Sequence, residues 1–279
     1  KQKAAPFIKY IRQLLPLLSN GTHPQSWDSD CQKVAGELDF YLPFRQRAPS
    51  IVLAMQTIYS NPVALLSREG LFNILCFRGA FYRSIWAKEH LRWFSTYEEW
   101  ENYLILTLPG TTPHEKEAYF VNKAAYGTPN RHRTLTNVKT YWTETQKMGI
   151  SDWESGLTYY RTSQNLVGLS TVLEQYFNIG ELTGLLIIGD LIHCGLLPMP
   201  SIITWAHLIA HVDKGAYKQL ETLGMTHRRD DGTPDIDELA EVLQGLDDLI
   251  LENTTEGERT LMGYNIVMLE HALCKFGRL

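Results

Sequence analysis

The stretch Thr112-Pro113-His114-Glu115 carries a full set of signals for the start of an α-helix. In such a capping box the threonine hydroxyl accepts a hydrogen bond from the third helical amide, and the glutamate accepts one from the threonine amide. Proline suits the first helical position, because an N–H there would have no partner within the helix. The stretch therefore predicts a helix that begins at residue 113.

Similar signals recur along the chain. Ser95-Thr-Tyr-Glu98 and Ser151-Asp-Trp-Glu154 repeat the hydroxyl-to-glutamate spacing, Thr233-Pro234 repeats the proline, and Pro200-Ser201 places a capping hydroxyl before an apolar segment. Glycines that follow periodic segments, as left-handed residues after a helix do, are Gly21, Gly127, Gly149, Gly180, Gly224 and Gly277. The chain is therefore expected to consist of many short helices.

Apolar residues between these signals recur every three or four positions, which is the period of a helix with one buried face. The clearest stripes are Trp27, Cys31, Val34, Leu38 and Tyr41; Leu166, Leu169, Leu173, Tyr176 and Phe177; and Ile266, Leu269, Leu273 and Phe276. The alternating pattern of strands is nearly absent. The fold class predicted is all-α, an irregular multi-helix bundle or stack of about a dozen helices with no regular repeat.

The predicted helices lie near 5–19, 27–41, 50–59, 62–69, 71–93, 96–107, 113–126, 135–148, 152–160, 163–179, 181–195, 202–213, 215–223, 234–251 and 255–276. We expect Pro16 to end or kink the first of them. A break near Gly263 is expected in the last.

The length of 279 residues suits one large core, because single cores stop growing at roughly 250–300 residues. We expect a single helical domain over 1–279. The alternative is a division near 128–134 into a basic lobe, 1–130, and an acidic lobe, 134–279. Up to residue 133 the chain carries 16 Lys and Arg against 11 Asp and Glu, and beyond it 10 against 20.

No segment of the sequence is typical of a membrane span. The most apolar stretch, 182–197, is short for a span of roughly 20 residues, and Lys9 and Arg12 interrupt the apolar run expected of a signal peptide. The four cysteines form no CxxC pair, which favours free thiols in a reducing compartment. We expect an intracellular protein, cytoplasmic or nuclear, although glycosylation sequons at 20–22 and 253–255 leave a secreted alternative.

Asp190 and His193 are the candidates for catalysis. They lie one turn apart in a segment, 185–193, whose other residues are nearly all apolar, and a helix that is apolar on all sides is buried. A buried carboxylate needs a partner, because an isolated charge in a core is very costly. The pair is interpreted either as an acid–base or metal-ligand pair or as a structural buried pair; a further structural alternative is that Asp190 caps a neighbouring helix.

His207 and His211 also stand one turn apart and, with Asp190 and His193, would complete a four-ligand metal site. The helical wheel argues against convergence, because the two imidazoles lie opposite an apolar face. That face consists of Trp205, Leu208, Ile209 and Val212. The glutamate of an HExxH motif is also missing, so we expect no metal site.

Four arginines in predicted loops, Arg45, Arg47, Arg131 and Arg133, are the candidates for binding. Aromatic residues near them in sequence are Tyr41, Phe44, Trp93, Tyr97 and Trp100. Phosphate contacts and stacking surfaces are what single-stranded nucleic acid requires. The basic half carries an excess of five charges at most, which is small for a nucleic-acid-binding protein.

Motifs for cofactors and common catalytic mechanisms are missing: the chain has no GxGxxG, no Walker loop and no GxSxG. We expect no cofactor and favour a non-catalytic interaction module that binds a protein partner or self-associates. One surface would be an acidic helix pair near 234–258, and the other the four arginines. The alternatives are a nucleic-acid-binding helical protein, such as a coat protein or nucleoprotein, and an all-α enzyme that uses Asp190 and His193.

Overall fold

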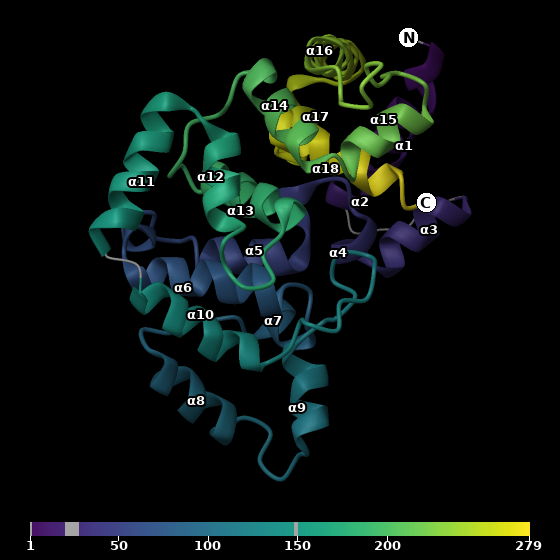
Figure 1. Cartoon of the computed structure of the whole chain (residues 1–279). Helices are drawn as coiled ribbons and strands as arrows, with labels where there is room; N and C mark the ends of the chain where they lie inside the picture. Colours follow the sequence, from purple (N-terminus) through teal and green to yellow (C-terminus); the bar gives the residue numbers. More distant parts are fainter. Residues whose placement is uncertain (1, 20–27, 148–149) are drawn as a thin grey trace. The chain divides into compact units, whose positions relative to one another are not determined.

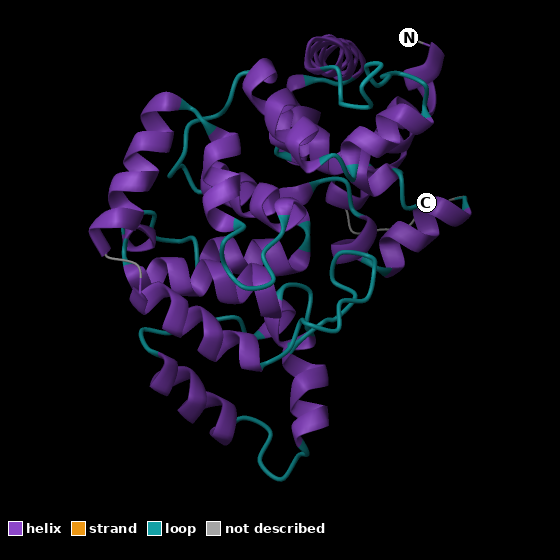
Figure 2. Ribbon diagram, viewed as in Figure 1, coloured by secondary structure: helices purple, strands orange, loops and turns teal. Residues whose placement is uncertain are grey.

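The computed structural model describes residues 2–19, 28–147 and 150–279, which form helices joined by turns and loops (Figures 1 and 2). These described residues contain no strand, but one isolated bridge pairs Arg228 with Pro234. The predicted all-α fold is confirmed. No helix among the described residues is long and apolar enough to cross a membrane.

Some of the predicted helix signals lie at residues that the structure does not describe. Gly21, Trp27 and Gly149 are not among the described residues, and the side chain of Ser151 is not described. The cap, stop and apolar-stripe signals at these positions therefore stay predictions.

Contacts between helices divide the chain into two compact units. Unit 1 comprises Lys1–Ile51 and Pro200–Leu279, and unit 2 comprises Val52–Met199. The segment 128–134 lies within unit 2. Unit 1 carries 14 Lys and Arg against 18 Asp and Glu, and unit 2 carries 12 against 13. The net charges of −4 and −1 show that the opposite signs of the two sequence halves do not become opposite signs of the units.

In unit 1 the helix α18 (Ile266–Phe276) lies at the centre. Its residues Met268, Leu269 and Leu273 are fully buried. The helix packs against the short helices α4 (Leu38–Tyr41) and Arg45–Arg47 and against three longer ones, α1 (Ala5–Leu14), α14 (Ile202–Val212) and α15 (Ala216–Thr222). The remaining helices are α2 (Pro16–Ser19), α3 (Ser29–Gly36), α5 (Pro49–Gln56, which continues into unit 2), α16 (Ile236–Asn253) and α17 (Glu256–Met262).

Several predicted boundaries in unit 1 are confirmed. The first predicted helix divides at Pro16, the hydroxyl of Ser201 caps α14, and Gly263 ends α17 with φ at +65°. The start of α16 differs from the prediction. Asp235, instead of Thr233, is its cap, because the Asp235 carboxylate accepts hydrogen bonds from the amides of the second and third residues.

Unit 2 is built from short helices around a large aromatic cluster. Its helices are α6 (Arg68–Cys76), α7 (Ile85–Glu89), α8 (Tyr97–Leu106), α9 (Pro113–Phe120), α10 (Thr136–Lys147), α11 (Ile150–Ser163), α12 (Leu166–Leu173) and α13 (Glu181–His193). The aromatic rings that contact one another are Phe81, Trp86, Phe94, Trp100, Tyr103 and Phe120. Most of these ring pairs meet edge-to-face or tilted, and edge-to-face pairs add to the free energy gained by burial.

The prediction of a single long helix over 71–93 is wrong. α6 ends at Cys76 and continues as one turn of π-helix, Phe77–Phe81, in which the amide of Tyr82 donates to the carbonyl of Phe77 at 2.7 Å. The chain then turns at Arg83, whose φ of +63° is incompatible with a right-handed helix. The predicted cap of α8 is also off by one residue, because Thr96, instead of Ser95, caps it.

We predict that Thr112→Ala lowers the free energy of unfolding by about 1 kcal/mol. Its hydroxyl accepts from the amide of Glu115, and the Glu115 carboxylate accepts from the amide of Thr112 at 2.7 Å, so the capping box is confirmed. Chemical denaturation measures the change. Thr158→Ala is the control, because this mid-helix hydroxyl bonds the carbonyl of Glu154 within α11 and alanine is the better helix former. Equal losses for the two variants would contradict the prediction.

Candidate functional site

Asp190 lies at the centre of unit 2, on α13, and its side chain is fully buried. The carboxylate accepts hydrogen bonds from Nε and Nη2 of Arg78, each at 2.6 Å, and from the hydroxyl of Tyr59 at 2.9 Å. Arg78 is also fully buried and stands in the π-helix Phe77–Phe81. The predicted need for a partner is thus met by a bidentate ion pair and one hydroxyl.

The electrostatics of this pair follow from its burial. Burial lowers the pKa of Arg78, but the charge and hydrogen bonds of Asp190, together with Tyr126 and Tyr82, outweigh burial and raise the pKa well above its ordinary value, so the guanidinium stays charged. Burial is the main cause that raises the pKa of Tyr59, and the negative charge of Asp190 is the second. The guanidinium of Arg78 also lies 4.4 Å from the centre of the Tyr82 ring, which favours a cation there.

The catalytic candidates occupy different surroundings. Asp190 is sealed from solvent by its helix and bound by Arg78 and Tyr59, whereas His193, one turn further along α13, is half-buried. A general acid or base must reach its substrate directly or through a water molecule. The Asp190 carboxylate has no such access, and its partners in the structure are Arg78 and Tyr59, neither of which the sequence analysis paired with it.

The π-helix collects further polar contacts. The carbonyl of Arg78 accepts from the hydroxyl of Tyr126 at 2.7 Å and from Nη2 of Arg133, and Nε of Arg133 donates to the carbonyl of Ala80 at 3.2 Å. Arg133 is therefore buried, with 3% of its surface exposed. This corrects the expectation that Arg133 is an exposed loop arginine, because its guanidinium satisfies backbone carbonyls in the core.

The other predicted binding arginines are also spread out. Arg45 is buried at 1% exposure in unit 1, and Nε of the exposed Arg47 donates to the carbonyl of Leu261 at 2.9 Å. Arg131 is exposed, and its Nε lies 3.3 Å from Nε2 of His132 in unit 2. The burial of Arg45 means that this residue, like Arg133, is not the surface arginine that was predicted for binding. Each unit thus keeps one of these arginines near its surface, and neither unit has a basic groove formed by them.

The histidines of α14 behave as the helical wheel indicates. His207 is exposed and His211 is half-buried, and the opposite face of the helix is in the core. Among the residues that the structure describes, no group of three or more His, Cys, Asp or Glu side chains is arranged to hold a metal ion.

A second buried carboxylate, Glu270 of α18, was not anticipated from the sequence. It is 3% exposed, and burial raises its pKa to about 7, although the positive charges of Arg45, Arg278 and Lys275 partly oppose this shift. A glutamate at the centre of an apolar stripe is the sequence signal that could have revealed it. Its protonation is coupled to folding, because the unfolded chain binds the proton less tightly.

The exposed face of α16 is acidic. The helix buries Leu239, Leu243, Leu246 and Ile250, and on the opposite face it exposes Asp237, Glu241, Asp248 and Glu252. From residue 230 to residue 258 the chain has eleven acids and no Lys or Arg. We call Asp237, Glu241, Asp248 and Glu252 the acidic face. It corresponds to the acidic surface predicted near 234–258.

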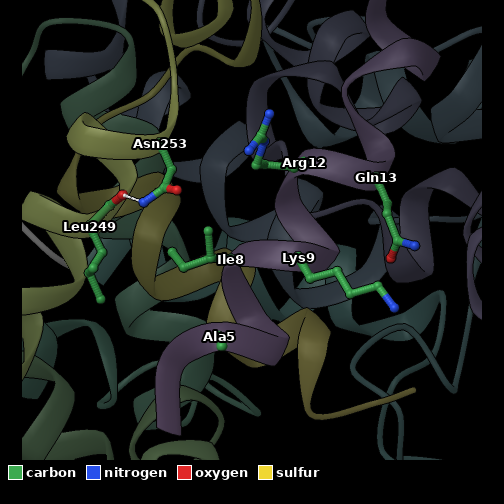
Figure 3. A pocket seen from close by; sticks show the side chains of 7 residues that line it. All are labelled: Ala5, Ile8, Lys9, Arg12, Gln13, Leu249 and Asn253. Carbon is green, nitrogen blue, oxygen red and sulfur yellow. Dashed lines mark hydrogen bonds between the residues drawn. The ribbon is translucent and has the colours of Figure 1, made fainter. Parts of the chain in front are cut away.

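An open groove of about 580 Å³ lies between α1 and α16 within unit 1. Figure 3 shows Ile8 and Arg12 of α1 beside Leu249 and Asn253 of α16, with Lys9 and Gln13 further round α1. The seven side chains that line the groove are Ala5, Ile8, Lys9, Arg12, Gln13, Leu249 and Asn253. None is acidic. Part of this groove could be anticipated from the sequence, because Lys9 and Arg12 interrupt the first apolar run.

Comparison with protein-family models, with curated proteins and with solved structures found no match to this chain. Functional inference therefore depends on the residues of the chain itself.

We predict that Asp190→Leu lowers the free energy of unfolding by about 3–5 kcal/mol, because it leaves the Arg78 cation buried without its counter-ion. The double variant Arg78→Met/Asp190→Leu should lose less, since it removes both charges. Chemical denaturation of the single and double variants measures the difference. If the double variant loses as much as the sum of the two single variants, the ion pair is not coupled as described.

We predict that the wild-type free energy of unfolding falls relative to that of Glu270→Gln as the pH rises from about 4.5 to about 7. Because the folded-state pKa is raised from the usual 4.5 to about 7, the proton stabilises the folded state most below the unfolded pKa, and this contribution is lost above the folded one. The relative change amounts to about 3 kcal/mol. Denaturation from pH 4 to pH 8 measures it, with the exposed Glu241→Gln as control; parallel curves for wild type and Glu270→Gln would contradict it.

Proposed function

We propose that the chain is a non-catalytic helical interaction module that binds a basic surface of a partner protein through the acidic face of α16. The observation that carries the proposal is that this helix has its apolar side chains buried on one face and its acids exposed on the opposite face. The buried leucines hold α16 against α14, so its acids are presented on a packed, 18-residue helix.

Two nearby acids have partners of their own and are not part of this face. Asp247 accepts from the hydroxyl of Tyr264 at 2.6 Å, and Glu238 pairs with His227 at 3.0 Å. Within the acidic face, Asp248 accepts a hydrogen bond at 2.9 Å from Nε2 of Gln244, one turn earlier on the same helix, and its carboxylate is still exposed. Exposed Leu251 adds an apolar contact on the same helix. Charge complementarity of this kind chiefly increases the association rate and partner specificity.

The alternatives have less support from the site geometry. A nucleic-acid site required Arg45 and Arg133, and both are buried. An enzyme required access to Asp190, which is sealed. Self-association through the four arginines loses two of them for the same reason. A basic region on a different protein is therefore the partner chemistry that we propose.

We predict that Asp237→Asn/Glu241→Gln/Asp248→Asn weakens binding of a lysine-rich peptide by about tenfold at low salt, because each exposed charge pair contributes up to about 1 kcal/mol. Fluorescence anisotropy of the labelled peptide measures this with the intact chain. Wild-type binding should weaken as the salt concentration rises over roughly 0.05–0.5 M.

The matched control is Glu89→Gln/Glu98→Gln/Glu154→Gln, which removes the same charge from exposed positions of unit 2. This variant should retain wild-type affinity. Equal weakening by both variants would mean that the peptide responds to net charge and not to the acidic face, and the proposal would fail.

A further inference from the structure

The groove of Figure 3 combines cationic and apolar side chains. Ile8 and Leu249 are half-buried and face one another across it, and Ala5 continues the apolar surface along α1. Arg12 lies beside them, one turn after Ile8. Small-molecule sites commonly have this composition, a mainly apolar lining with a few polar groups, and volumes of roughly 300–1,000 Å³.

The cations of the groove are available to a ligand. Lys9 and Arg12 are exposed, and their side chains form no hydrogen bond or ion pair with the described residues. Two acids lie within electrostatic range, since Lys9 contributes to the lowered pKa of Asp28 and Arg12 to that of Glu258.

Both of these acids are already engaged in capping helices. The carboxylate of Asp28 accepts from the amide of Cys31 at 3.0 Å at the start of α3. That of Glu258 accepts from the amide of Thr255 at 2.7 Å in the capping box of α17. The carboxylates of Asp28 and Glu258 are therefore partly occupied by backbone amides. Neither carboxylate forms an ion pair with Lys9 or Arg12 among the described residues.

From this arrangement we infer that the groove binds a small organic carboxylate with a short aliphatic chain. The carboxylate lies against Arg12, and the chain lies between Ile8 and Leu249. The side chain of Lys9 extends away from Leu249 and adds a second positive charge at the edge of the groove (Figure 3). Asn253 borders the same space, with its Nδ2 already donating to the carbonyl of Leu249 at 2.7 Å. This site uses the cations of α1, so it is independent of the proposed protein-binding role of the acidic face.

The test is titration of the intact ¹⁵N-labelled chain with sodium octanoate, followed by amide chemical shifts. Octanoate should bind saturably below ~10 mM, which is the range of weak small-ligand affinity, and should shift amides of α1 and of residues 249–253. Octylammonium, which has the same chain and the opposite charge, and acetate, which lacks the chain, should not saturate. Saturable binding of octylammonium with equal affinity would overturn the inference.

Lys9→Gln/Arg12→Gln should weaken octanoate binding by about tenfold, since the Arg12 contact and the nearby Lys9 charge are both lost. Lys88→Gln, an exposed lysine of unit 2, and the triple variant of the acidic face should bind octanoate as the wild type does. Thermal unfolding confirms that each variant is folded. Absence of saturation with the wild type, or unchanged affinity in the double variant, would overturn the inference, and neither result would alter the peptide measurements.

Discussion

The ion pair between Arg78 and Asp190 is the constraint around which unit 2 is arranged. From Thr183 to Ile192 α13 is buried on all sides, so the one carboxylate in that stretch can be accommodated only where a cation meets it with matching geometry. Two hydrogen bonds at 2.6 Å and a tyrosine hydroxyl at 2.9 Å provide this match. The three residues are far apart in the sequence, and their meeting fixes the position of α13 relative to the π-helix Phe77–Phe81.

Much of the local structure could be predicted from the sequence because its signals act over a few residues. The capping box at Thr112, the break at Pro16 and the stop at Gly263 all depend on hydrogen bonds within one turn. The π-helix could not be predicted in this way. A Cβ atom on Gly79 would lie 2.0 Å from the hydroxyl of Tyr141, so the shape of that turn depends on a contact with α10.

The candidate sites show the same limit. Burial of Asp190 and its need for a partner follow from the apolar segment around it, but the identity of Arg78 depends on a contact between residues 112 positions apart. The four arginines were chosen as polar residues in loops, and Arg45 and Arg133 are nevertheless buried. The net charges of the two sequence halves do not describe the two units, because unit 1 combines segments from both halves of the chain and both units have a negative net charge. The acidic face was predictable, since it lies within one helix.

The carbonyl of Arg78 has a consequence for the long connection between α9 and α10. Tyr126 and Arg133, which both lie in this connection, donate to that single oxygen, and Arg133 reaches Ala80 as well. A surface loop generally accepts insertions with little penalty, because few of its atoms are fixed. This one is tied at two points to the backbone of a buried turn. Deleting residues between the two donors would pull at least one of them from the core, so natural or engineered shortening should be concentrated in other connections of the molecule.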